Sequence, residues 1–152
     1  AKTDLVKLIR DICITFEGQI PGIRFENVPE TFQTFVDTEQ IETVLKNLLD
    51  NALKYSTVGN APVEICLKKS DAGTLIEIQD RGPGIQDEEL DLIFEPFYRT
   101  DKSRNRKTGG YGLGLSLCKT IIEAHGGTID VQSNTGKGTM FSLHLPKSTS
   151  TI

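Results

Sequence analysis

Apolar and polar residues alternate with helical spacing in two long segments of the chain. In residues 3–16 and 37–56 the apolar side chains fall three or four positions apart, so each segment is predicted to form a helix with one buried face. Each segment opens with a Thr and an Asp that can cap its helix, at positions 3–4 and 37–38. The apolar stripe of the second helix consists of Ile41, Val44, Leu45, Leu48 and Ala52.

Alternation with a period of two predicts strands in other parts of the chain. Strands are expected in residues 23–28, 63–69, 74–80, 127–133 and 138–146. A short helical stretch at 87–94 and a longer helix after Gly112 complete the pattern. Because tight turns join several of the strands, we expect a layer of helices on one face of a mainly antiparallel sheet.

Length and composition indicate one domain. The chain has 152 residues, of which 37% are hydrophobic and 25% charged, which is typical of a soluble globular protein. The net charge of −4 gives no reason to expect nucleic acid or an anionic membrane as a partner. No apolar run approaches the ~20 residues of a membrane span, and we expect a cytoplasmic domain at 1–146 with a disordered tail at 147–152.

The cysteines and the methionine add two expectations. Cys13, Cys66 and Cys118 lie far apart with no C-x-x-C pattern, so we expect three lone thiols in a reducing compartment and no metal site built on them. The only methionine is Met140. This indicates a fragment cut from a longer protein, although removal of an initiator methionine would give the same sequence.

Glycines gather in the stretch GGYGLGLSL, residues 109–117, directly before the last predicted helix. The spacing fits neither the dinucleotide-binding G-x-G-x-x-G pattern nor a P-loop. Backbone N–H groups at a helix N-terminus, free of β-carbons, are nevertheless suited to bind an anion. A flexible glycine hinge explains this stretch equally well when it is taken alone.

Two asparagines lie at the border of the apolar stripe in the second helix. Asn47 and Asn51 are four residues apart, so they share one face and should be half-buried. A hydrated Mg²⁺ beside a phosphate would satisfy their amides, but bonds to neighbouring backbone would do so as well. Lys54 and Tyr55 follow on the same side and offer an ammonium and a ring.

A carboxylate ends one predicted strand, in the stretch DRGPGI at residues 80–85. Asp80 in that position can sit in a pocket and accept a hydrogen bond from an exocyclic amine. Gly82 and Gly84 would let a flat ring approach the backbone. A plain β-turn is the alternative, since Asp, Gly and Pro also favour turns.

Five motifs together resemble the N, G1, F, G2 and G3 boxes of the ATP-binding catalytic domain of sensor histidine kinases. They are NLLDNALKY, DRGPGI, FEPFYR, GGYGLGLSL and GKGTMF, in that order, from Asn47 to Phe141. Type II topoisomerases, Hsp90-type chaperones and MutL-type repair proteins belong to the same superfamily. The resemblance implies an α/β (α+β) two-layer sandwich, the Bergerat fold, with three helices on a mixed, mainly antiparallel sheet of about five strands.

For the phosphates and the metal, the resemblance implies a Mg²⁺ ligand at Asn51. It places Asn47, Lys54 and Tyr55 near the phosphates and the ribose of ATP. The turn that faces the phosphates and opens the last helix is then formed by Gly110, Gly112, Leu113, Gly114 and Leu115.

For the base, the resemblance implies that Asp80 recognises adenine. Gly84 and, through water, Thr139 would assist it. The other positions implied near the nucleotide are Gly82, Ile85 and Tyr98.

The segment between the F and G2 boxes resembles the ATP lid of the family. Its basic residues are Arg99, Lys102, Arg104, Arg106 and Lys107. Such a run is usually a solvated loop, but beside a triphosphate we expect at least one direct phosphate contact, from Arg99. Phe94 and Phe97 are expected to anchor the lid.

The residue four positions before Asn51 separates the branches of the superfamily. Members that hydrolyse ATP, and the related serine kinases, carry a glutamate there as general base, whereas this chain carries Asn47. Without that base, ATP should stay intact for a nucleophile that needs little activation, such as an imidazole. His125, before a capping Gly126 where a partial positive charge suits the helix dipole, and His144, in a strand, are both expected to be structural.

The resemblance therefore predicts one part of an enzyme, an ATP-dependent protein histidine kinase with no certain catalytic residue in this chain. A dimerisation and histidine phosphotransfer domain of the same parent protein would supply the phosphorylated histidine, and a response regulator receiver domain would take the phosphoryl group onward. The fragment should bind Mg²⁺-ATP, not phosphorylate itself, and make no direct contact with nucleic acid or membrane. Whether the parent is an inner-membrane sensor stays open. The alternatives are a serine kinase of the anti-sigma-factor type and a scaffold that has lost nucleotide binding.

Overall fold

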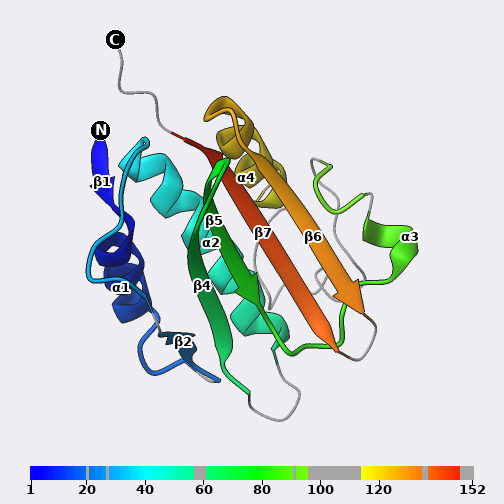
Figure 1. The fold of residues 1–152 in the computed structure, drawn as a ribbon. Coiled ribbons are helices and arrows are strands. Elements are labelled where there is room, and N and C mark those ends of the chain that lie inside the picture. Colours follow the sequence, from blue (N-terminus) through cyan, green and yellow to red (C-terminus); the bar gives the residue numbers. More distant parts are fainter. Residues whose placement is uncertain are drawn as a thin grey trace.

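A five-stranded sheet is the centre of the fold in the computed structural model (Figure 1). The structure describes residues 1–19, 21–26, 28–56, 61–90, 92–95, 114–134 and 137–147. The strand order is β2-β4-β5-β7-β6, with β2 parallel to β4 and the other neighbours antiparallel. The strands of this sheet are β2 (Ile23–Phe25), β4 (Val63–Ser70), β5 (Gly73–Gln79), β6 (Thr128–Asn134) and β7 (Gly138–Pro146).

Three long helices lie together on one face of the sheet (Figure 1). A short fourth helix follows the end of β5. The helices are α1 (Leu5–Thr15), α2 (Thr38–Tyr55), α3 (Asp87–Leu90) and α4 (Gly114–Ala124). The predicted two-layer architecture with a mixed, mainly antiparallel sheet is confirmed.

The core lies between the helices and the sheet. Alternate side chains of β7 point into it, because Phe141, Leu143 and Leu145 are buried while the residues between them are more exposed. The apolar stripe of α2 is also buried, and its residues Ile41, Val44 and Leu48 are fully covered. The packing of α2 on the sheet therefore fixes this helix against the strands that carry the polar residues described below.

A second, two-stranded sheet was not predicted from the sequence. β1 (Lys2–Asp4) pairs antiparallel with β3 (Gln33–Phe35) beside α1. Asp4 caps α1, as one of the two predicted alternatives, because its Oδ1 accepts from Val6 N–H at 3.0 Å. The same oxygen accepts from Phe32 N–H at 3.0 Å, which ties the start of α1 to the segment before β3.

His125 joins the C-terminal end of α4 to the N-terminal end of α2. Its Nδ1 lies 2.9 Å from the carbonyl oxygen of Ile121, and its Nε2 accepts from the N–H of Asp37, the cap of α2, at 3.0 Å. Gly126 follows with φ of 79°, as expected of a capping glycine. The structural role is confirmed, because both ring nitrogens contact backbone groups of the two helix ends.

The cysteines are free thiols at three different depths. Cys118 is buried in α4, and burial raises the pKa of its thiol to about 12. Cys66 is exposed on β4, and Cys13 is half-buried. Within the described ranges, no helix combines the length and the apolar character that a membrane span requires.

Candidate functional site

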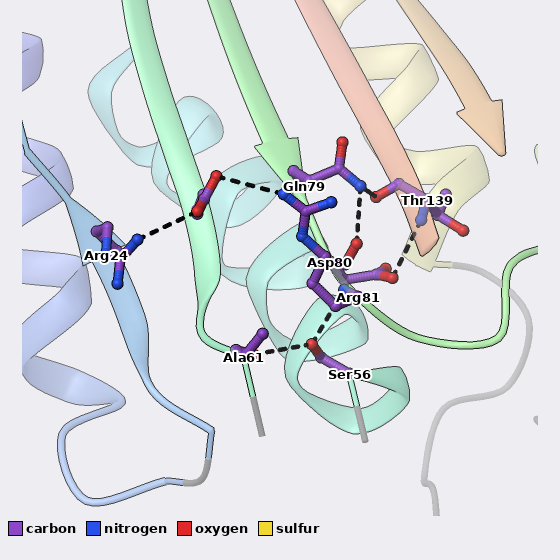
Figure 2. A network of polar contacts seen from close by, with 8 residues as sticks. Arg24, Ser56, Ala61, Gln79, Asp80, Arg81 and Thr139 are labelled. Carbon is purple, nitrogen blue, oxygen red and sulfur yellow. Dashed lines mark hydrogen bonds and ion pairs between the residues drawn. The ribbon is translucent and has the colours of Figure 1, made fainter. Parts of the chain in front are cut away.

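The carboxylate of Asp80 is buried at the end of β5 and is held by backbone (Figure 2). Its Oδ1 accepts from Gly82 N–H at 2.9 Å and from Thr139 N–H at 3.1 Å. Both bonds go to the same oxygen, so Oδ2 makes no hydrogen bond to the described part of the chain. The arrangement leaves one carboxylate oxygen free to accept a bond from a ligand.

Burial is the strongest influence on the pKa of Asp80 and raises it. The hydrogen bonds from Gly82 and Thr139 act in the opposite direction, as does the positive charge of Arg81. A carboxylate kept at this depth without an ion partner in contact is unfavourable for the fold. Perturbed acids of this kind are typical of functional sites rather than of structural turns.

Glycines bring the backbone close to this carboxylate. Gly138 has φ of 102°, and a β-carbon there would overlap the carbonyl oxygen of Asp80. Gly84 has φ of 84° in the turn that follows Asp80. Both positions lie in the left-handed region, where glycine has no steric penalty. The close packing of the G1 and G3 boxes therefore depends on glycine at 138.

Ser133 of β6 connects the turn after Asp80 to the start of β7. Its Oγ accepts from Ile85 N–H at 2.6 Å and lies 2.9 Å from Thr139 Oγ1 and 3.2 Å from the carbonyl oxygen of Gly138. The two ends of the turn are thus fixed to the same hairpin, one through Thr139 and one through Ser133.

The asparagines of α2 are half-buried, as predicted. Asn47 Nδ2 donates to the carbonyl oxygen of Thr43 at 3.0 Å, and Asn47 Oδ1 lies 3.5 Å from where a β-carbon on Gly114 would be. The amide of Asn47 therefore faces the first turn of α4. Asn51 makes no side-chain hydrogen bond to the described residues, so its amide is available to a ligand.

The end of α2 carries the two remaining predicted residues of the N box. Lys54 is exposed, and its Nζ lies 2.9 Å from Asp50 Oδ2. Tyr55 is the last residue of α2, and its side chain lies outside what the structure describes.

Leu115 follows Gly114 in the first turn of α4. It is half-buried and packs against the core. Phe94 of the F box also packs there, with its ring edge-to-face on Phe141 at a centroid distance of 6.2 Å. The lid that Phe94 is predicted to anchor lies outside the described residues, so that role stays a prediction. Other predicted positions lie outside the described residues: Phe97, Tyr98, Arg99, Lys102, Arg104, Arg106, Lys107, Gly110, Gly112 and Leu113.

The amide of Asn51 could hold a magnesium ion. Mg²⁺ takes oxygen ligands together with water and substrate phosphates, and Asn51 offers an amide oxygen with no bond to the described chain. Within the described ranges, His, Cys, Asp and Glu form no group of three that could hold a metal.

Three residues of the polar network, Ser56, Gln79 and Ser133, were not predicted from the sequence. Ser56 accepts from Arg81 N–H at 3.1 Å, and Gln79 Nε2 donates to the carbonyl oxygens of Asp80 at 2.7 Å and Thr139 at 3.3 Å (Figure 2). Their partners are mostly backbone groups, which leave no side-chain pattern in the sequence. Only the position of Ser56 directly after the N box could have drawn attention to it.

Comparison with known proteins identifies the family of this chain. Residues 36–149 match the family model described as "Histidine kinase-, DNA gyrase B-, and HSP90-like ATPase". The sensor protein SrrB of Staphylococcus aureus is 44% identical over 111 residues, which are 73% of this chain and 19% of SrrB. The chain thus spans about a fifth of the length of that relative.

Solved structures of histidine kinases share the whole fold. The mycobacterial sensor histidine kinase MprB superposes with a TM-score of 0.82 at 30% identity, covering 97% of this chain and 98% of that one. The catalytic domain of histidine kinase ThkA gives 0.83 at 31% identity, covering 97% and 95%. Full-length ShkA in complex with AMPPNP gives 0.79 at 26% identity, covering 99% and 31%. The chain belongs to the family of histidine kinase-, DNA gyrase B- and HSP90-like ATPase domains, and within it to the catalytic domains of sensor histidine kinases.

Proposed function

We propose that this domain binds ATP with Mg²⁺ and donates the γ-phosphoryl group to a histidine on a separate dimerisation domain of its parent protein. The observation that carries the proposal is the buried Asp80, whose Oδ1 is held by two backbone N–H groups while Oδ2 has no bond to the described chain. An exocyclic amine is the natural donor to such an oxygen, and adenine carries one where guanine carries a carbonyl oxygen.

The phosphates would lie between α2 and the first turn of α4. Asn47 Oδ1 lies close to Gly114 at the start of α4, and Asn51 and Lys54 follow on the same side of α2. Asn51 would hold Mg²⁺, which neutralises phosphate charge when it is bound. Backbone N–H groups at the start of α4 would add the partial positive charge of a helix N-terminus.

The accepting histidine must come from another domain. Both ring nitrogens of His125 are engaged by backbone groups of the helix ends. His144 is on β7, with its Nε2 3.7 Å from Asp130 Oδ2, whereas its neighbours Leu143 and Leu145 are buried in the layer below. Neither imidazole lies with the polar groups around Asp80.

The relatives support a role in two-component signalling. SrrB is named as a sensor protein, and ThkA and MprB as histidine kinases. ShkA was solved with AMPPNP, an analogue of ATP. By analogy, a response regulator receiver domain would take the phosphoryl group from the histidine, and the domain described here would work in the cytoplasm without touching nucleic acid or membrane.

Phosphoryl transfer in trans tests the proposal. The chain is incubated with γ-labelled ATP, alone and together with the histidine-bearing domain of its parent. We expect no label on this chain and acid-labile label on the partner domain, which a His→Gln change in the partner abolishes. Label on this chain alone, or acid-stable label on a serine substrate, would contradict the proposal and favour the serine kinase alternative. Absence of any nucleotide binding would favour the scaffold.

A further inference from the structure

Ser56 lies where the helix of the N box meets the turn of the G1 box. It caps the C-terminal end of α2, directly after Tyr55, and only 2% of its surface is exposed. Its Oγ accepts from Arg81 N–H at 3.1 Å and lies 3.5 Å from the carbonyl oxygen of Ala61 (Figure 2). The hydroxyl is thus used by backbone groups on both sides and is not available to solvent.

The bond from Arg81 fixes the residue that directly follows Asp80. On the other side, Asp80 N–H donates to the carbonyl oxygen of Thr139 at 2.9 Å. The carboxylate is therefore held between β7, through Thr139, and the end of α2, through Ser56. A shift of the Arg81 backbone away from Ser56 would turn Asp80 relative to the helix that carries Asn51.

The side chain of Arg81 cannot replace this bond. Its Nη2 lies 3.9 Å from Glu64 Oε2, and Glu64 also accepts from Arg24 Nη1 at 3.3 Å. The side chains of Arg24 and Arg81 are about half exposed, and ion pairs of this kind contribute little in water. The buried hydroxyl, whose loss would leave a backbone donor without its partner, is the stronger restraint.

We propose that Ser56 is a positioning residue for base recognition: its hydroxyl sets the backbone of Arg81, and thereby the direction in which the free oxygen of Asp80 faces the base. The inference rests on the proposed function, in which Asp80 accepts from the amine of adenine. It predicts that loss of the Ser56 hydroxyl lowers the affinity for adenine nucleotides more than the affinity for nucleotides with another base.

The test compares the affinities of ADP and IDP by calorimetric titration of the 152-residue chain. Hypoxanthine carries an oxygen where adenine carries the amine, so IDP binds without the bond to Asp80. Ser56→Ala is expected to lower the affinity for ADP about 3- to 10-fold, which is the effect of one misaligned hydrogen bond. The affinity for IDP should change less than about 2-fold. The ratio of ADP affinity to IDP affinity therefore falls.

Ser70→Ala is the matched control. Ser70 donates to the carbonyl oxygen of Gly73 at 3.2 Å in the turn at the opposite end of β5 from Asp80. Each variant removes a hydroxyl that bonds to the backbone, so a general effect of losing such a bond would appear in both. We expect Ser70→Ala to keep the full preference for ADP.

Two further variants keep the test decisive. In an Asp80→Asn background Ser56→Ala should no longer change the ratio of ADP to IDP affinity, because the group it positions is gone. If Ser56→Ala does not fold, Ser56→Cys keeps a similar volume with a weaker acceptor and should lower the preference in the same direction.

The outcomes separate this inference from the function on which it rests. If the unchanged chain prefers ADP and Ser56→Ala keeps that preference, the role of Ser56 is overturned and the adenine site stands. If the unchanged chain binds neither nucleotide, the proposed function is wrong and the role of Ser56 is wrong with it.

Discussion

The backbone N–H of Thr139 donates a 3.1 Å hydrogen bond to Oδ1 of Asp80, although 59 positions separate the two residues in the chain. The neighbouring strands β5 and β7 bring them together, since Gln79 pairs with Met140 in the antiparallel ladder. The G1 and G3 boxes are therefore two sides of one structure. Any change at the start of β7 should reach the carboxylate directly.

Asp80→Asn should separate stability from binding. Burial raises the pKa of Asp80 above its unfolded value, so its protonated form stabilises the fold at acidic pH and this contribution is lost as the pH rises through the folded pKa. The ionised carboxylate is therefore unfavourable at neutral pH. We expect the variant to keep or raise the free energy of unfolding at neutral pH, with the gain disappearing in acid.

The same variant should bind ATP about 10- to 150-fold more weakly, because a hydrogen bond to a charged group is lost. Urea denaturation at neutral and acidic pH measures the free energy of unfolding, and calorimetric titration measures the affinity for ATP. A clear loss of stability at neutral pH with unchanged ATP affinity would show that Asp80 is only a turn residue.

Gly138→Ala should lower the free energy of unfolding by more than backbone strain alone would. A β-carbon there would overlap the carbonyl oxygen of Asp80, and the residue has φ of 102°. We expect a loss of about 3 to 5 kcal/mol from overlap and strain together.

Gly18→Ala provides the matched control for this change. Gly18 has φ of 88°, but nothing lies within 4 Å of the added carbon. Strain alone should cost about 1 kcal/mol. Equal losses in the two variants, measured by urea denaturation, would contradict the close packing of the G1 and G3 boxes.

Gly114→Ala should spare the fold and impair the site. The added carbon would lie 3.5 Å from Asn47 Oδ1, an ordinary contact, and alanine favours helices over glycine. We expect the free energy of unfolding to be unchanged or higher and the affinity for Mg²⁺-ATP to fall, because the added carbon would lie against Asn47, whose amide is assigned to the phosphates. If thermal denaturation and titration show that both are unchanged, the phosphates do not lie there.

His125→Ala should lower stability without changing nucleotide recognition. The imidazole accepts from the N–H of Asp37 and contacts the carbonyl oxygen of Ile121, and both bonds are lost. A loss of about 1 to 3 kcal/mol is expected. The folded variant should still prefer ADP to IDP, whereas loss of that preference would place His125 in the function of the site.

Long periodic segments made most of the fold predictable. The apolar stripes of α1 and α2 and the alternation in β4, β5, β6 and β7 follow directly from burial on one face. β1 and β3 have three residues each, too few for a period, and their pairing depends on contacts between distant segments, such as the bond from Phe32 N–H to Asp4. In the predicted stretch at 87–94 the described helix is Asp87–Leu90.

The site was predictable where a functional side chain stands in a recognisable position of a helix or strand. Asp80 ends a strand before two glycines, and the half-buried asparagines of α2 lie four residues apart on a helical face. Ser56 and Ser133 could not be found in this way, because their partners are the backbone N–H groups of Arg81 and Ile85. Only the fold brings those groups within reach.

The most direct measurement is calorimetric titration of the unchanged chain with ATP and GTP, with and without Mg²⁺. Binding of ATP that Mg²⁺ strengthens, together with no detectable binding of GTP, is the result predicted from the free oxygen of Asp80 and the amides of α2. Equal binding of both nucleotides, or binding of neither, would contradict the assignment of Asp80 as the group that recognises adenine.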